Sequence, residues 1–237
     1  MNFYETMRDI YNSFTKSESI VQARNKKEAG DNKIIEISEG DLSKGDLSKG
    51  DSSKGDSSVA DSAFEESNIT HVIIRGDITR IENHAFLRCK YLKSILISES
   101  VRSIGKGAFF HCEALEGIII SDAVSFIDKH AFGYCDSLKN IILPKSLTTI
   151  EEGTFESCTS LTMVIIPSSV TTISDVAFHY CLSLEIIYIP KSVTKIGKWA
   201  FKSCTSLGQI AIPYIFKDQL YDIFMEVDLT KIIITYI

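Results

Sequence analysis

The stretch IYIPKSVTKIGKWAFKSCTSL, residues 187–207, contains every element of a pattern that recurs along the chain. Residues 161–183, LTMVIIPSSVTTISDVAFHYCLS, show the same pattern one period earlier. Self-similarity at a fixed period of 20–50 residues is the signature of repeat architectures. The chain is therefore predicted to be a repeat protein.

The period is 23 residues, and four columns of apolar residues keep it through six units. These columns are Cys89, Cys112, Cys135, Cys158, Cys181 and Cys204; Phe86, Phe109, Phe132, Phe155, Phe178 and Phe201; Leu92, Leu115, Leu138, Leu161, Leu184 and Leu207; and Ile81, Ile104, Ile127, Ile150, Ile173 and Ile196. A unit this short cannot bury its own apolar face. Neighbouring units must therefore stack and share one continuous core.

Each unit is expected to have two parts. The segment SLTMVII, residues 160–166, alternates and is rich in β-branched residues, which favours a short strand. Ala177, Phe178, Cys181 and Leu184 follow at intervals of roughly three residues, which indicates one helical or 3-10 turn. Serine and threonine residues between the two parts are expected to form bends.

This pattern resembles the BspA-like leucine-rich repeats, a family found in surface proteins of oral bacteria and in parasitic protists. The resemblance covers residues 69–213, which hold six 23-residue repeats and a final strand. It implies an α/β repeat solenoid: a curved, right-handed coil with a parallel β-sheet on the concave face and short helical or 3-10 turns opposite. It also implies binding of other proteins without catalysis.

Side-chain alternation predicts which residues of each strand face outward. Ile141 and Leu143 should face the core, so the residue between such a pair points to the concave side. The large apolar members of this outward column are Ile73, Leu96, Ile119, Ile142, Ile165 and Tyr188. A more varied flanking column adds Asn140, Met163 and Ile186 as candidate partner-binding residues.

Two interpretations of the outward column stay open. β-Propensity alone favours isoleucine on a strand. An apolar stripe across six strands nevertheless approaches the patch size typical of interaction sites. We expect a protein partner, of unknown identity, to bind here; self-association and cover by an N-terminal helix are the alternatives.

A polar pentapeptide is repeated between residues 40 and 58, GDLSKGDLSKGDSSKGDSS. The chain between Ile37 and Val59 is longer than the corresponding chain between Ile97 and Ile104, and the excess equals three pentapeptides. Surface loops tolerate such growth because the entropy of loop closure rises slowly with length. We therefore predict a disordered insert within a degenerate first repeat, residues 33–68.

Both ends of the chain resemble caps for the stack. Residues 1–32 are expected to form a cap whose amphipathic helix carries the apolar stripe Phe3, Met7, Ile10 and Phe14. Residues 214–237 are expected to form a helix over 215–226 followed by a strand in KIIITY. Such covers protect the last core layer and the open strand edge.

The sequence shows no catalytic, cofactor or metal motif. The cysteines lack the close pairs that zinc sites use and are expected to be buried free thiols. The five histidines have no recurring acidic neighbour in the sequence and are interpreted as surface residues. The aspartates of the pentapeptides, spaced five apart, do not match a calcium loop. We therefore predict that the protein is not an enzyme and needs no cofactor.

Charge and hydropathy bound the remaining possibilities. The net charge of −6 gives no electrostatic reason to expect nucleic acid. No stretch approaches the roughly 18 apolar residues of a membrane span, and the N-terminal residues lack a secretory pattern. The expected function is a protein–protein interaction module in the cytoplasm. The alternatives are a cell-surface adhesin or antigen, reaching the surface by unconventional export, and a self-associating scaffold.

Overall fold

The computed structural model describes residues 34–37 and 57–237 of the chain. The expected N-terminal helix and residues 40–56 of the pentapeptide segment lie outside these ranges.

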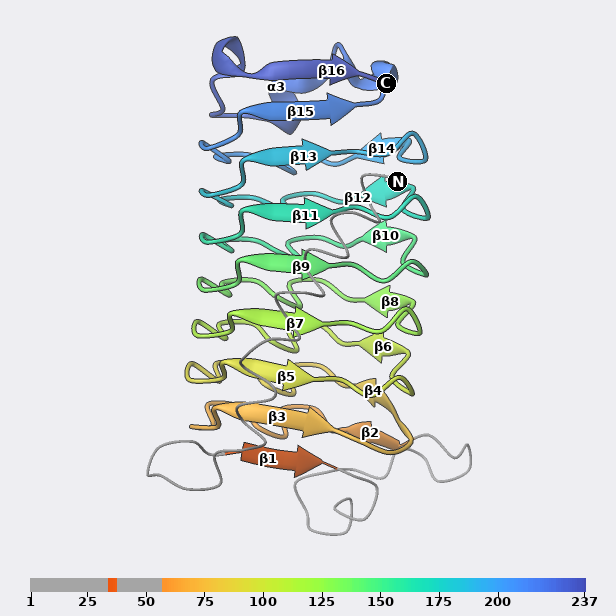
Figure 1. The fold of residues 1–237 in the computed structure, drawn as a ribbon, viewed down its shortest axis with the longest axis vertical. Coiled ribbons are helices and arrows are strands. Elements are labelled where there is room, and N and C mark those ends of the chain that lie inside the picture. Colours follow the sequence, from red (N-terminus) through yellow and green to blue (C-terminus); the bar gives the residue numbers. More distant parts are fainter. Residues whose placement is uncertain (1–33, 38–56) are drawn as a thin grey trace, which may run out of the picture.

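The described residues form a stack of coils, each of which contributes one strand to a nine-stranded sheet (Figure 1). The sheet is parallel throughout, because each strand pairs with the equivalent strand of the next coil. In spatial order its strands are β1 (Ile34–Ile37), β3 (His71–Ile74), β5 (Ser94–Leu96), β7 (Gly117–Ile119), β9 (Asn140–Ile142), β11 (Met163–Ile165), β13 (Ile186–Tyr188), β15 (Gln209–Ile212) and β16 (Ile233–Tyr236). The predicted solenoid with a parallel sheet is confirmed.

A second row of short parallel strands follows the first around each coil, where the sequence indicated only bends. The four-stranded part comprises β2 (Ser57–Val59), β4 (Ile78–Ile81), β6 (Ser103–Ile104) and β8 (Phe126–Ile127). The three-stranded part comprises β10 (Thr149–Ile150), β12 (Thr172–Ile173) and β14 (Lys195–Ile196). Most of these strands are too short to show alternation. Their signal is the isoleucine column, which provides their last residue from β4 to β14.

The strand register agrees with the positions at which Ile37 and Val59 were aligned in the first repeat. Ile37 pairs with Ile74 in the large sheet, and Val59 pairs with Ile81 in the small one. Ile37 and Val59 therefore occupy the positions in the two sheets that the repeat pattern assigns to them. Ser57 and Ser58, the last residues of the pentapeptide segment, already belong to β2.

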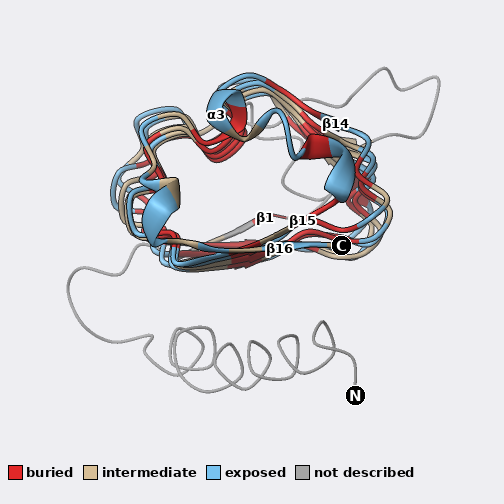
Figure 2. Ribbon diagram, turned by 90° about the horizontal axis from the view of Figure 1, so that it is seen from above, coloured by how far each residue is buried: buried red, intermediate tan, exposed pale blue. Residues whose placement is uncertain are grey.

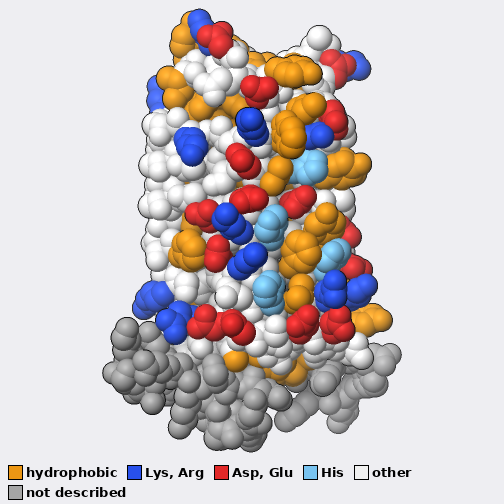
Figure 3. Space-filling view, turned by 180° about the vertical axis from the view of Figure 1, so that it is seen from behind, with side chains coloured by type: hydrophobic (Ala, Val, Ile, Leu, Met, Phe, Trp, Pro, Cys, Tyr) orange, Lys and Arg blue, Asp and Glu red, His pale blue; other side chains and the backbone are white. Residues whose placement is uncertain are grey.

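In the coils of the six repeats, the side of the stack opposite the large sheet consists of tight turns (Figure 2). Bonds within a turn, such as Leu87 N–H to His84 C=O (2.8 Å), alternate with bonds to the next coil, such as Phe86 N–H to Ala108 C=O (2.8 Å). Two residues in each full repeat adopt left-handed φ, as His130 (55°) and Tyr134 (58°) do in one. Left-handed residues interrupt a helix, so the helical turns expected here are replaced by successive reverse turns. Figure 3 shows the outer surface of this side.

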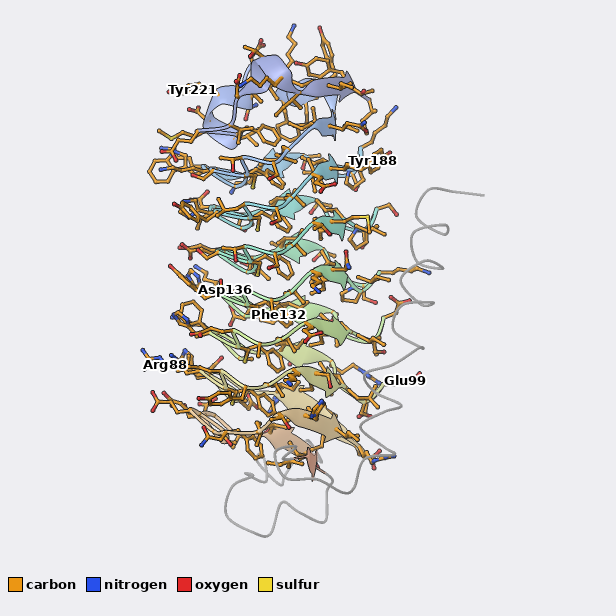
Figure 4. All side chains as sticks on the ribbon, turned by 60° about the vertical axis from the view of Figure 1, so that its left-hand side comes forward. Arg88, Glu99, Phe132, Asp136, Tyr188 and Tyr221 are labelled. Atoms are coloured by element: carbon orange, nitrogen blue, oxygen red, sulfur yellow. The ribbon has the colours of Figure 1, made fainter. Side chains whose placement is uncertain are left out.

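A column of stacked phenylalanine rings runs through the core. Neighbouring ring centroids lie 5.1–5.6 Å apart from Phe64 to Phe224. The ring of Phe132, labelled inside the stack in Figure 4, is fully buried. Beside it the Cys135 thiol donates to the Phe109 carbonyl of the preceding coil at 3.2 Å. The other repeat cysteines make the corresponding bond.

The prediction of a helix over 215–226 is wrong, because the C-terminal residues continue the coil instead. They form η2 (Tyr214–Phe216), one turn of α3 (Leu220–Ile223), η3 (Leu229–Lys231) and β16. The reason is that this segment must match the last repeat: Phe224 stacks on Phe201 at 5.2 Å, and the Ile223 carbonyl accepts from the Phe201 N–H. The predicted strand in KIIITY is confirmed as β16.

Candidate protein-binding surface

The predicted outward column lies in register across six neighbouring strands. Strand pairing aligns these residues in the order Ile73, Leu96, Ile119, Ile142, Ile165 and Tyr188. Neighbouring strands are about 4.8 Å apart, so the column extends over roughly 24 Å. We call the side of the large sheet that bears this column the sheet face.

The column points away from the core, as alternation predicts. Ile141 is 2% exposed and belongs to the continuous core, whereas its neighbour Ile142 is half-buried and does not. Ile119 is 37% exposed and Tyr188 is 45% exposed. Figure 4 shows the Tyr188 side chain on the outside of the stack.

The exposure of this column is uneven, which alternation did not predict. Ile73 and Ile165 are 7% and 8% exposed, although neither belongs to the core cluster. Ile165 lies in register between Ile142 and Tyr188, so its side chain has a neighbour of the same column on each side. Ile165 would therefore form part of the base of a binding surface and would not protrude toward a partner.

The flanking residues meet the outward column at β11 and β13. Asn140, Met163 and Ile186 are in register, and Ile186 is 42% exposed. Here the surface is hollowed into a groove of about 840 Å³. Its lining includes Met163, Ile165, Ile186, Tyr188, Pro167 and Pro190.

Sequence reasoning identified the first four of these groove residues but not the two prolines. Pro167 and Pro190 follow the two strands and are buried in the loops at their ends. The signal was present in the repeat pattern, where proline follows the last core residue of the strand. It did not indicate a groove, because only the coil geometry brings the prolines beside the exposed strand residues.

The opposite side of the stack carries mixed charged, hydrophobic and histidine side chains (Figure 3). Nδ1 of His130 and Nδ1 of His179 each lie 3.4 Å from a different oxygen of Glu156. Both histidines are half-buried at the surface, so their interpretation as surface residues agrees with the structure. Their acidic partner was missed because it comes from a neighbouring coil and is distant in sequence. Within the described residues, no cluster of three or more histidine, cysteine, aspartate or glutamate side chains could hold a metal ion.

The thiols are confirmed as buried and free. Burial raises the pKa of the Cys89 thiol to about 12 and raises the pKa of the Cys135 thiol well above its usual value. A raised pKa disfavours the thiolate, which is the nucleophile and the metal ligand. The cysteine column therefore contributes to packing rather than to reaction chemistry.

Comparisons with known proteins agree with this architecture. The family described as "BspA type leucine rich repeat region (6 copies)" matches residues 31–139, 57–185 and 125–236. Among curated proteins, none matches the sequence. None of the helices in the described ranges is long and apolar enough to cross a membrane.

The solved structures that are similar to this chain include two leucine-rich repeat proteins. A leucine-rich cell surface protein from Faecalibacterium prausnitzii A2-165 is 36% identical over 65% of this chain, with a TM-score of 0.59. The chain spans 42% of the length of that protein. A leucine-rich repeat protein from T. pallidum is 26% identical, with a TM-score of 0.66, over 84% of this chain and 86% of the other. The repeat columns, the stacked coils and the family match together show that this chain belongs to the BspA type leucine-rich repeat family.

Proposed function

We propose that this chain is a non-catalytic module that binds another protein through the sheet face. The observation that supports the proposal is the in-register apolar column, whose members lie outside the core cluster and of which Ile119 and Tyr188 are exposed. Leucine-rich repeat proteins of this kind are protein-interaction modules, which agrees with that use of the surface.

The middle of the column is the proposed centre of the interface. Ile119 and Ile142 lie on neighbouring strands, with groove residues Met163 and Ile186 on the next two. Interfaces concentrate their binding energy in a few central, apolar residues, each worth about 2 kcal/mol or more on truncation. A partner that spans these strands contacts all four residues at once.

Partner capture with three forms of the full chain tests this proposal. We expect Ile119→Glu to lose the partner that the wild-type chain retains from cell extract, because it places a charge at an apolar contact. Tyr180→Glu is the matched control: Tyr180 is exposed on the turn side, and its column already contains Glu66 and Glu226 at similar φ. Retention of the same partner by Ile119→Glu, or its loss from both variants, would contradict the proposal. Light scattering of the purified chain shows whether that partner is a second copy.

Exposure at the cell surface, as an adhesin or antigen, is a second candidate. It is supported by the similarity to the F. prausnitzii protein that is described as a cell surface protein, and it is favoured over the cytoplasmic location expected from the sequence. Biotinylation of intact cells with an impermeant reagent tests it. Labelling of the chain at the level of a known surface protein is expected, and labelling only after lysis would refute it.

A further inference from the structure

The groove over β11 and β13 has a more specific shape and charge than the rest of the sheet face. Its lining begins before the strands at Thr162 and Glu185 and continues past them to Ser169 and Ser192. At the spacing of an extended chain, about 3.3 Å per residue, this corresponds to roughly six residues, or about 20 Å. The volume of the groove lies within the range that is typical of ligand sites.

We propose that this groove binds an extended segment of a partner protein that carries a large apolar side chain followed by an acidic residue. The proposal rests on the proposed function of the sheet face and names the chemistry of the segment that is recognised there.

The apolar requirement follows from the floor and wall of the groove. Met163 and Ile165 lie side by side on β11, and Ile186 and Tyr188 are their register partners on β13. Ile186 and Tyr188 are 42% and 45% exposed, so an apolar side chain seated among the four residues removes part of their surface from water. Burial of apolar surface is the main favourable contribution in such a contact.

The acidic requirement follows from the loop end of the groove. Lys191 is exposed at this end, and Lys145 lies two coils away in the same column, with its Nζ 4.0 Å from Asp122. Within the described part of the chain, Lys191 forms no ion pair. A carboxylate at this end of the bound segment complements Lys191.

A column of serine residues beside these lysines supplies a hydroxyl donor for the carboxylate of the bound segment. Ser146 Oγ donates to the Asp122 carbonyl at 2.6 Å, and Ser169 Oγ donates to the Leu147 carbonyl at 2.7 Å. Ser192 Oγ, which belongs to the groove lining, is buried and has no hydrogen-bond partner among the described residues. Its hydroxyl donates to no group within the described residues and can donate to the segment after rotation of its side chain toward the groove.

The charge at the other end sets the direction of the segment. Glu185 is exposed at the start of β13, and the lining residues at this end include no base. Like charges across an interface oppose binding and fix its register. The acidic residue therefore lies toward Lys191, and the opposite end of the segment is neutral or basic.

A library of short random peptides, displayed on phage and selected on the full chain, tests the proposal. We expect recovered peptides to share a large apolar residue with Asp or Glu a few positions to one side. The best synthetic peptide should bind Lys191→Glu and Ile186→Glu about tenfold or more weakly than wild type. Replacing its acidic residue by Lys should restore binding to Lys191→Glu. Trp199→Ala, on the turn side, is the control and should leave Kd within about twofold.

The outcomes separate this inference from the proposed function. The requirement for an acidic residue is wrong if the selected peptides contain none, or if a peptide with Lys in its place does not regain affinity for Lys191→Glu. If Ile142→Glu still abolishes binding of these peptides, the proposed function of the sheet face stands. Peptides that ignore both Ile142→Glu and Ile186→Glu contradict the inference and the proposed function together. A selection that enriches no peptide overturns the inference, and the partner-capture experiment then decides the function alone.

Discussion

The His130 ring packs directly against Gly153 of the next coil, and this contact predicts how much stability Gly153→Ala loses. Gly153 has φ = +60°, and a Cβ added there would meet the His130 ring of the preceding coil. Alanine in the left-handed region costs about 1 kcal/mol, and forcing apart two packed groups costs about 1–3 kcal/mol more. We therefore expect Gly153→Ala to lower the free energy of unfolding by about 2–4 kcal/mol.

A double-mutant cycle separates these two costs. His130→Ala alone removes an aromatic contact with Phe110, whose ring centroid is 6.1 Å away, and should cost about 1 kcal/mol. In the double variant the steric conflict is absent, so only the backbone cost and the lost contact remain. The two substitutions should therefore be non-additive by about 1–3 kcal/mol, with the double variant more stable than the sum predicts.

Urea unfolding followed by far-ultraviolet circular dichroism measures all four forms. Gly117→Ala is the control, because no atom lies within 4 Å of its added Cβ and its φ is not left-handed; its effect should be between zero and about 1 kcal/mol of stabilisation. Additivity within about 0.5 kcal/mol, or equal losses for Gly117→Ala and Gly153→Ala, would refute the reasoning.

Three further predictions concern the core and the insert. All six thiols should resist a bulky thiol reagent in the native state and react in denaturant, because they are buried; rapid native labelling would contradict this. Deleting residues 41–55 restores the spacing of the other coils and should leave the midpoint of thermal unfolding nearly unchanged, whereas a lost cooperative transition would make the insert structural. Phe132→Ala should cost about 3–5 kcal/mol in urea unfolding, and the half-buried terminal Phe64→Ala clearly less; equal costs would argue against a continuous ring column.

Much of the fold was predictable because contacts between equivalent residues of neighbouring coils recur in the sequence with a period of 23 residues. The Phe132 ring stacks on its equivalents in the neighbouring coils, and the Cys135 thiol bonds to the Phe109 carbonyl. Each such contact repeats at the same offset, so the column is visible in the sequence. The register of Ile37 and Val59 was predictable for the same reason, even though the insert separates them.

Features that depend on contacts between unlike residues of different coils were not predictable. Glu156 lies between His130 and His179, which come from two other coils. The groove depends on the loop prolines lying beside Ile186 and Tyr188. The C-terminal segment has helical spacing in sequence, but Phe224 follows the ring column of the last repeat instead. In each case the tertiary stack determines the local conformation.

The sheet-face account is tested most directly by one substitution made at two adjacent residues, with unfolding and partner affinity measured on both variants. Ile142→Glu should keep the wild-type unfolding midpoint, because its side chain lies outside the core, and should weaken the partner's affinity by about 2 kcal/mol or more. Ile141→Glu should unfold the middle of the stack, because it buries a charge in the core. Unfolding of Ile142→Glu, or wild-type affinity in that variant, would contradict the account.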